Sequence, residues 1–408
     1  MIFLRFSFLN ICQIWFHFYI NTDIHIKKSQ GENKMKTTIL AIIAIIILLT
    51  CTCPIEKSKI IQTDIKEKSL PESFTWQDIE GIDYTTEIKD QSPAPTCEAY
   101  ALCAALETIM QYQKNETYNP DLSETHLYFY AGGTFDAGYV NLIDAANYLV
   151  EHGVPDEGCY PDPQRAYDYP FISLDGWENR TTKISSWDWV NNTETEIKEA
   201  LIEHGPLVFC AYFWKDFNFY LRGIYKHRRG LLAGGHVMTI VGYDDSEQCW
   251  IVKNSWGTNW GLDGWLKMSY DADMITNQWY TQYDENCTGI MYLDGAYGNL
   301  EPDVPKVYID NLNIRKSYVL GNEIRTLFSK SRFFTSTTPR VFGNMEIKVT
   351  AENADRVEFY LDGVKSHIDD ASPFTWNLEA IRGRHTLTVK AIKGQNASLD
   401  IRDFYKII

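Results

Sequence analysis

Three side chains far apart in the sequence could together perform nucleophilic chemistry. Cys97 offers a thiol at the start of an expected helix, His236 offers an imidazole after Gly235, and Asn254 offers a carboxamide after a short apolar strand. A thiol must lose its proton to attack a carbonyl carbon, and the imidazole that takes this proton needs a third group to orient it. These residue types in this chain order predict a cysteine nucleophile, its base and the group that orients the base.

The residues around these three positions resemble the papain-like cysteine peptidases over about residues 70–293. His236 lies 139 residues after Cys97, within the spacing typical of papain and cathepsins, and Asn254 lies 157 residues after it, slightly beyond that spacing. Asn254 opens the motif Asn-Ser-Trp-Gly-Thr-Asn-Trp-Gly. The resemblance implies that Asn254 accepts the second imidazole proton and that Trp256 shields this hydrogen bond from water.

The resemblance also implies groups that bind the substrate. Gln91, six residues before Cys97, would donate its side-chain amide to the oxyanion together with the backbone N–H of Cys97. Gly138 and Gly235 would pair with the substrate backbone, because a residue without Cβ lets an extended peptide approach closely. The pocket for a substrate side chain would be lined by three further residues: Val140, Cys210 and Gly234.

The segment around the nucleophile departs from the family pattern Cys-Gly-[Ser/Ala]-Cys-[Trp/Tyr]. It reads Ala94-Pro95-Thr96-Cys97-Glu98, and Ala94 and Phe135 stand where relatives have a bridged cysteine pair. Glu98 replaces an aromatic residue, and a carboxylate beside a thiolate opposes ionisation of the thiol. We expect Glu98 to point away from the sulfur and to stabilise the helix start through the helix dipole.

Length, composition and charge bound the remaining possibilities. A chain of 408 residues with 45% hydrophobic residues predicts two or three domains with packed cores. The formal net charge of -16 argues against a nucleic-acid partner, since phosphate binding needs clustered Lys and Arg. No nucleotide-binding or zinc-peptidase motif occurs, and His152 and His204 each precede a glycine, as helix-ending residues do. We therefore expect no metal and no cofactor.

The N-terminal segment predicts export. Residues 1–34 are expected to be untranslated or disordered, with Met35 as the initiator. Residues 35–53 are expected to form a signal peptide, because their apolar run of eleven residues is too short to span a bilayer. Lipid attachment at Cys51 is the alternative to ordinary cleavage. Residues 54–69 are expected to form a polar tether. Because of the expected signal peptide, we expect an extracellular or cell-surface protein.

The resemblance implies an α+β fold with a helical lobe and a β-rich lobe over residues 70–298, with the active cleft between them. Hydrophobic periodicity and capping residues predict three helices, at residues 96–111, 142–152 and 196–204. Apolar runs predict that strands then dominate, at residues 207–213, 237–243, 250–253 and 264–270.

The pattern changes after a linker at residues 299–305. Residues 306–408 resemble a bacterial Ig-like β-sandwich, with Asp362-Gly363 as a hairpin turn. Its strands are expected at residues 306–309, 345–351, 356–361, 386–392 and 398–405. Such a domain is a spacer or stabilising appendage, or it contacts a surface or carbohydrate, because the fold alone does not define a function.

The nine cysteines do not predict a disulfide framework. When the nucleophile and the three cysteines before it are set aside, five remain, and an odd set cannot pair completely within one chain. Cys103 in a helix and Cys210 in an apolar strand are typical of free cysteines that pack as small hydrophobic residues.

Taken together, these features predict a secreted or surface cysteine peptidase that forms a thioester acyl-enzyme with peptide or protein substrates. The main alternative is a catalytically silent papain-like module for adhesion or peptide binding, suggested by Glu98 and the Ig-like region. Retention of all the expected catalytic groups favours the enzyme. A third possibility is an acyltransferase or peptide ligase, which differs only in whether an amine outcompetes water at the acyl-enzyme.

Overall fold

The computed structural model describes residues 70–134, 138–162, 173–299, 303–313, 316–324 and 338–408. The expected signal peptide, the tether, Cys51 and Phe135 lie outside these residues. Within the described ranges, no helix is both long enough and apolar enough to cross a bilayer.

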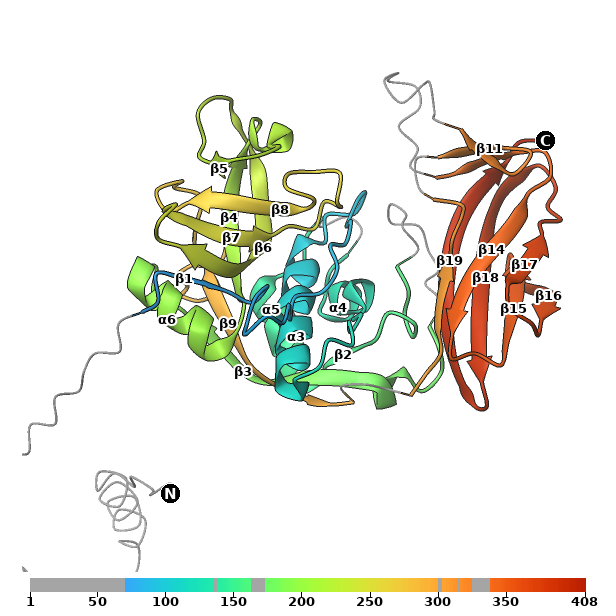
Figure 1. Ribbon diagram of the computed structural model, residues 1–408, viewed down its shortest axis with the longest axis horizontal. Helices are drawn as coiled ribbons and strands as arrows, with labels where there is room; N and C mark the ends of the chain where they lie inside the picture. The colour runs from blue at the N-terminus through green and yellow to red at the C-terminus, as the bar shows by residue number, and fades with distance from the viewer. Residues whose placement is uncertain (1–69, 135–137, 163–172, 300–302, 314–315, 325–337) are drawn as a thin grey trace, which may run out of the picture. The chain divides into compact units, whose positions relative to one another are not determined.

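A central helix organises the first part of the chain (Figure 1). This helix, α3 (Cys97–Lys114), was expected at residues 96–111, and most of its residues are buried. It packs with α4 (Glu124–Tyr130) and α5 (Leu142–Glu151), and α5 ends one residue before the end of the helix expected at residues 142–152. The Asn141 side chain caps α5 by accepting the Ile143 N–H at 3.0 Å, and Gly153, with φ +80°, follows the helix end.

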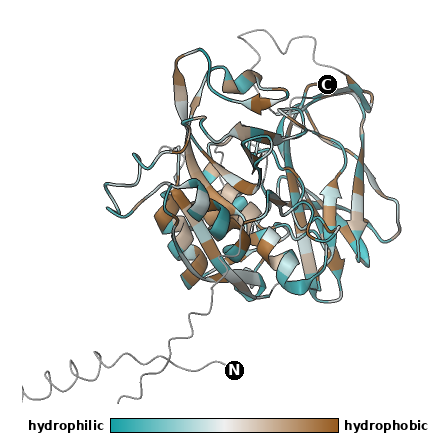
Figure 2. Ribbon diagram, turned by 60° about the vertical axis from the view of Figure 1, so that its left-hand side comes forward, coloured by the Kyte–Doolittle hydropathy of each residue, from teal (hydrophilic) through white to brown (hydrophobic). Residues whose placement is uncertain are grey.

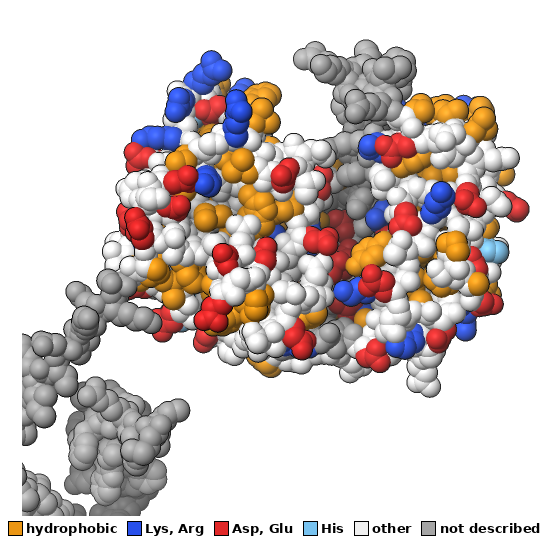
Figure 3. Space-filling model, viewed as in Figure 1, with side chains coloured by type: hydrophobic (Ala, Val, Ile, Leu, Met, Phe, Trp, Pro, Cys, Tyr) orange, Lys and Arg blue, Asp and Glu red, His pale blue; other side chains and the backbone are white. Residues whose placement is uncertain are grey.

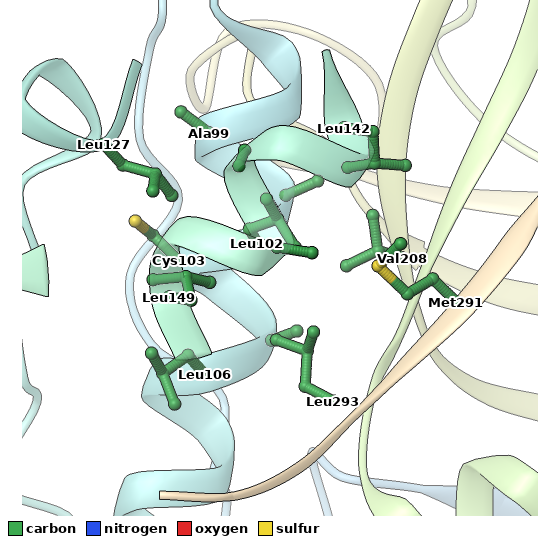
Figure 4. Close-up of a cluster of buried hydrophobic side chains, with 14 of the residues drawn as sticks. Ala99, Leu102, Cys103, Leu106, Leu127, Leu142, Leu149, Val208, Met291 and Leu293 are labelled. Atoms are coloured by element: carbon green, nitrogen blue, oxygen red, sulfur yellow. The ribbon is translucent and has the colours of Figure 1, made fainter. Parts of the chain in front are cut away.

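The core around α3 is made of aliphatic side chains from helices and strands. Figure 4 shows Leu102 and Leu106 of α3 beside Leu149 of α5 and Leu293 of strand β9. All four side chains are fully buried. This packing fixes the direction of α3, and therefore the position of its first residue, Cys97.

A nine-stranded sheet runs beside the helices in the order β2-β3-β9-β4-β6-β7-β8-β5, with β1 paired to β6. All four expected strands are present, but β6 begins five residues before residue 237, so His236 lies inside a strand. The remaining strands β1, β2, β3, β5 and β9 were not expected. The bounds are β1 (Ser73–Thr75), β2 (Val154–Pro155), β3 (Thr181–Trp189), β4 (Leu207–Trp214), β5 (Ile224–Tyr225), β6 (Leu232–Asp244), β7 (Cys249–Lys253), β8 (Trp265–Ser269) and β9 (Ile290–Gly298).

Three short helices flank this sheet. Helix α6 (Glu194–His204) was expected at residues 196–204, and it begins two residues earlier because Thr193 caps it by accepting the Glu196 N–H. The other two are the 3-10 helices η1 (Trp177–Arg180) and η2 (Phe217–Phe219). The helices and the nine-stranded sheet together form the expected α+β fold.

The C-terminal residues form two further sheets, as expected for an Ig-like sandwich. One has the order β10-β14-β17 and the other β12-β11-β13-β19-β18-β15-β16. Hydrophobic and hydrophilic residues alternate along these strands (Figure 2), and β14 accordingly alternates between exposed and buried side chains. The bounds are β10 (Lys306–Ile309), β11 (Ser317–Val319), β12 (Asn322–Ile324), β13 (Arg340–Phe342), β14 (Glu346–Glu352), β15 (Arg356–Leu361), β16 (Val364–Asp369), β17 (Phe374–Asn377), β18 (Gly383–Lys393) and β19 (Asn396–Lys406).

The expected hairpin turn joins β15 to β16. Leu361 pairs with Val364, and the two residues between them, Asp362 and Gly363, have φ +50° and +79°. Positive φ at both central positions is the signature of a type I′ turn, which Asp-Gly favours. The five strands expected here are all present, whereas β11, β12, β13, β16 and β17 were missed because they are short or largely exposed.

Candidate active site

The nucleophile predicted from the sequence lies at the first residue of α3, against strand β6. The Cys97 sulfur accepts a hydrogen bond from the backbone N–H of Val237, the residue after His236. The Thr239 hydroxyl donates to the Ala101 carbonyl at 3.1 Å, which ties β6 to the second turn of α3. Helix and strand therefore bring together two residues that are 139 positions apart in the sequence.

His236 and Asn254 form a buried hydrogen-bonded pair. The Nε2 atom of His236 lies 2.8 Å from the Oδ1 atom of Asn254. The same oxygen accepts the backbone N–H of Ser255 at 2.8 Å, which fixes the orientation of the amide. Because Oδ1 only accepts, Nε2 carries the proton, and Nδ1 is the ring nitrogen that remains to exchange a proton with a thiol.

Trp256 covers this pair with an aromatic wall. Its ring stacks on that of His236 with centroids 4.8 Å apart and planes inclined by 29°. Phe213 and Phe217 in turn pack edge-on against Trp256 at 5.7 and 5.3 Å. Such a wall excludes water and strengthens the hydrogen bond between His236 and Asn254, which is the role that the family resemblance implied for Trp256.

Gln91 is held beside Asn254 through Ser255. Its Oε1 atom accepts the Ser255 hydroxyl at 2.6 Å, and its backbone N–H donates to the Ser255 carbonyl at 2.9 Å. The Gln91 Nε2 atom donates to the Ala94 carbonyl at 3.0 Å. A side-chain amide has two N–H groups, so this contact uses one of them, and the second can donate to an oxyanion.

From the sequence we expected Glu98 to point away from the Cys97 sulfur. In the structure it does not. Its side chain is buried, with 5% exposure, and its Oε2 atom accepts from the Cys97 sulfur at 3.4 Å. Burial raises the pKa of Glu98 to about 7, although hydrogen bonds from the backbone, the Cys97 thiol and Tyr280 lower it. The expectation failed because Glu98 is buried and receives a hydrogen bond from Tyr280, a residue distant in sequence.

Burial also shifts the pKa values of the candidate nucleophile, Cys97, and of its candidate base, His236. Desolvation and the charge of Glu98 raise the pKa of the Cys97 thiol well above its usual value, against the Val237 N–H, which lowers it. Desolvation lowers the pKa of His236 to about 4, against the Asn254 hydrogen bond, which raises it. Both shifts favour the neutral thiol and the neutral imidazole, so the reactive ion pair must form by proton transfer within the site.

The two glycines expected to pair with substrate differ in their surroundings. Gly138 has φ +69°, and the nearest atom to a Cβ placed there would be Pro95 Cγ at 3.8 Å. Gly235 is covered by Trp279, whose ring would lie 2.5 Å from such a Cβ. Only a residue without a side chain fits beneath Trp279, which explains the glycine next to His236.

Two residues that sequence reasoning missed, Trp279 and Tyr280, come from the segment between β8 and β9. Their signal was an aromatic pair between polar neighbours in a long connection. The prediction that Val140 and Cys210 line an open substrate pocket is wrong. Both residues are buried in the core, at 1% and 0% exposure.

These features define the chemistry of a thiol-dependent hydrolase: a helix-start cysteine, a buried imidazole–amide pair on the adjoining sheet and a nearby amide donor. Comparison with known proteins reaches the same class. Residues 70–287, more than half of the chain, match the model of the papain family of cysteine proteases, and residues 335–389 match that of a bacterial Ig domain. The chain therefore belongs to the papain family of cysteine proteases.

Individual relatives are moderately similar. The chain is 30% identical over 239 residues to cysteine proteinase 2 of Entamoeba histolytica, which covers 55% of this chain and 70% of that protein. It is 28% identical over 215 residues to a cathepsin L-like proteinase of Fasciola hepatica, covering 50% and 62%. Among solved structures, bromelain from Ananas comosus aligns with 55% of this chain and 99% of its own, at 26% identity and a TM-score of 0.45.

Proposed function

We propose that this protein is an extracellular or cell-surface cysteine peptidase that hydrolyses peptide bonds through a thioester on Cys97. One observation carries the proposal. The hydrogen bond of 2.8 Å between His236 and Asn254 lies directly beside the strand residue, Val237, whose N–H reaches the Cys97 sulfur. A thiol, a base and a group that orients the base are the set that nucleophilic acyl transfer requires.

In the proposed first half-reaction, Nδ1 of His236 takes the Cys97 proton while the sulfur attacks the carbonyl carbon of the substrate. The carbonyl oxygen becomes an oxyanion that receives hydrogen bonds from the Gln91 amide and the Cys97 N–H. His236 then returns its proton to the leaving amine, the C–N bond breaks, and the acyl group remains on sulfur as a thioester.

In the second half-reaction, His236 removes a proton from water as the water oxygen attacks the thioester. The C–S bond breaks, the proton passes to the sulfur, and a carboxylic acid leaves. Asn254 supports both halves because it holds the imidazole ring in one orientation, through a bond that Trp256 shields. An amine in place of this water would make a new peptide bond, which is the transferase alternative.

The proposed domain organisation follows the sequence boundaries. Residues 70–298 would form the peptidase domain, 299–305 the linker and 306–408 the Ig-like sandwich, after export directed by residues 35–53. The match of a bacterial Ig domain supports a place outside the cell. In this organisation the sandwich is a spacer, with contact to a surface or carbohydrate as the alternative role.

A Cys-directed epoxide tests the proposal. We expect one molecule of the reagent to react with Cys97 and to block turnover of peptides, with the labelled site assigned by mass spectrometry. Cys103 and Cys210 provide internal controls, because both are free but have 0% exposure. Labelling of Cys97 should become much slower in His236→Ala. An unlabelled Cys97, or labelling at the same rate in that variant, would contradict the proposal.

A silent binding module remains the second candidate because of two observations. The Glu98 carboxyl lies against the nucleophile at 3.4 Å, and Trp279 covers Gly235, where a substrate strand was expected. A silent module would retain peptides in a binding assay but would neither react with the epoxide nor release products. Measuring both properties on the same preparation distinguishes the two functions.

A further inference from the structure

Exposed apolar side chains gather on one loop of the β-rich lobe. This loop, residues 215–232, runs from the end of β4 to the first residue of β6. Apart from tyrosines, every large hydrophobic residue that is exposed among the described residues between 70 and 298 lies in it. Phe219, Leu221 and Leu231 are the most exposed, at 80%, 70% and 72%, and Ile224 and Leu232 accompany them. Scattered exposed hydrophobic residues are ordinary, but a concentration of this kind on one loop marks a contact surface.

The 215–232 loop is also basic in an acidic protein. It contains five Lys and Arg residues and one Asp, so its formal charge is +4 (5 - 1), whereas the whole chain has -16. The acid, Asp216, is used within the loop, where it accepts the backbone N–H groups of Arg228 and Arg229 at 3.0 and 3.2 Å. Among the described ion pairs, only one includes a Lys or Arg of this loop, namely Lys226 with Asp271. The charges of Arg222, Arg228 and Arg229 therefore face solvent.

The loop has an anchored base, so its apolar side chains cannot turn inward. Phe217 is fully buried, and the Tyr220 hydroxyl donates to the Gly223 carbonyl at 2.6 Å. Strand β5 within the loop pairs with β8, and the rings of Trp214 and His227 stack at 4.4 Å. Figure 3 shows Lys and Arg side chains beside hydrophobic ones at the end of the lobe that carries β5.

We propose that the 215–232 loop docks this protein on an anionic phospholipid bilayer. Phe219, Leu221 and Leu231 would enter the boundary between headgroups and acyl chains, and the arginines would contact the lipid phosphates. Apolar insertion combined with unpaired cations is what binding to such an interface requires. The acidic remainder of the protein is repelled by the same surface, so the loop would approach first.

An acidic peptide is the competing partner, and the apolar residues disfavour it. Such a peptide would bind the cations but would gain little from three solvent-exposed hydrophobic side chains that protrude beside them. A bilayer uses both. Because Leu232 and His236 lie on the same strand, β6, docking through the loop would bring the candidate site close to the membrane surface. The inference does not depend on the catalytic activity of that site.

Vesicle binding by the full chain tests the charged part of the proposal. The probes are vesicles of phosphatidylcholine alone and vesicles that also contain phosphatidylglycerol, measured by co-sedimentation. We expect binding only with phosphatidylglycerol, and weaker binding at higher salt. The variant Arg222→Gln/Arg228→Gln/Arg229→Gln should lose about fivefold in affinity for each cation removed. Residues 1–69 are the same in every variant, so differences report on the loop.

The apolar part is tested by Leu221→Ser/Leu231→Ser, which should also weaken binding to the phosphatidylglycerol vesicles. A matched control is available in the sandwich, where Ile381 is 81% exposed beside the exposed Arg382. The variant Ile381→Ser/Arg382→Gln should bind vesicles as the wild type does. Thermal unfolding of each variant checks its fold, and the single change Leu221→Ser replaces any double variant that does not fold.

Three outcomes would overturn the proposal. The first is equal affinity for vesicles with and without phosphatidylglycerol. The second is unchanged binding in the loop variants or equal loss in the sandwich control. The third is a loss of affinity for an acidic peptide in the arginine variant with no change in vesicle binding, which would assign the loop to peptide recognition.

Discussion

Buried carboxylates have different partners at the candidate active site and in the β-sandwich. In the sandwich, Asp400 pairs with Arg402 and Asp403 pairs with Arg384. In the described peptidase region, the buried carboxylates of Glu107 and Glu124 share the ammonium group of Lys89. Glu98 differs from these residues, because no ion pair among the described residues reaches its buried carboxyl group, which is held by hydrogen bonds from the backbone, the Cys97 thiol and Tyr280. An unpaired buried charge is unfavourable, so electrostatic strain is concentrated beside the nucleophile.

Burial alone therefore does not distinguish a carboxylate beside a nucleophile from a carboxylate with a structural role. The carboxylates of the sandwich hold strands together, and their cations compensate for the lost hydration. Glu98 is compensated only by hydrogen bonds and by partial protonation, which links its charge to pH.

Removing the nucleophile should have the largest effect. We expect Cys97→Ala to lower kcat/KM for a peptide substrate by about 10⁴-fold or more, because acyl transfer has no nucleophile without the thiol. His236→Ala should be comparable, and the double variant should lose no more than either single variant, since the two residues act as a unit. The matched control is Cys103→Ala, a buried thiol on the same helix, which should keep the activity. Rapid turnover by Cys97→Ala would refute the assignment.

Removing the proposed oxyanion donor should have an intermediate effect. Gln91→Ala should lower kcat by about 10²–10³-fold with little change in KM, because the lost hydrogen bond acts mainly on the transition state. Ser255→Ala, which removes the hydroxyl that holds the Gln91 carbonyl, separates positioning from donation. It should lower kcat less. A higher KM with an unchanged kcat for Gln91→Ala would show that the amide contributes to substrate binding instead.

Neutralising Glu98 should shift the pH profile. Its carboxylate raises the pKa of Cys97, so Glu98→Gln should move the acidic limb of kcat/KM to lower pH by roughly one unit. Stability provides a second readout. The folded pKa of about 7 exceeds the usual 4.5, so the folded state binds the proton more tightly, and stability falls as pH rises from about 4.5 to 7. Urea titrations of Glu98→Gln should lack this fall, and an unchanged slope would mean that another group causes it.

The equivalent change in the sandwich should leave activity nearly unchanged. Asp400→Asn leaves Arg402 without its carboxylate and removes charge from the acceptor of the Ile309 N–H, which is bonded at 2.6 Å. We expect a loss of about 3 kcal/mol or more in unfolding free energy and no shift of the acidic limb. Denaturant unfolding and a pH–rate profile of the same preparation provide both measurements. A shifted limb would show that the two regions are electrically coupled.

Most helices and strands whose own residues show a clear apolar spacing or alternation could be predicted from the sequence. Helix α3 follows from its apolar spacing, and β10 and β15 from their short alternating runs. The start of β6 was placed too late because Gly234 and Gly235 weaken a strand pattern, yet pairing with β4 keeps them extended. Strand β3 was missed because its charged and aromatic residues carry no simple alternation, and its pairing with β9 is long-range.

In the candidate site, too, features with a local sequence signal could be predicted, and features that depend on long-range contacts could not. Cys97, His236 and Asn254 could be proposed as catalytic residues because their order, spacing and flanking residues are visible in the sequence. The environment of Glu98 could not be predicted, because Tyr280 reaches it from a connection that is remote in the chain. The cover that Trp279 places on Gly235 was missed for the same reason. Long-range contacts decide burial, and burial decides the charge state of the groups around a nucleophile.

The six cysteines among the described residues are all free, and this has a practical consequence for handling the protein. Cys97 is partly accessible, whereas the other five are buried. Strong reductants can therefore keep the nucleophile active without breaking a structural bond in this part of the chain. No disulfide has to form among the described residues, so a reducing environment is compatible with the folding of this part of the chain.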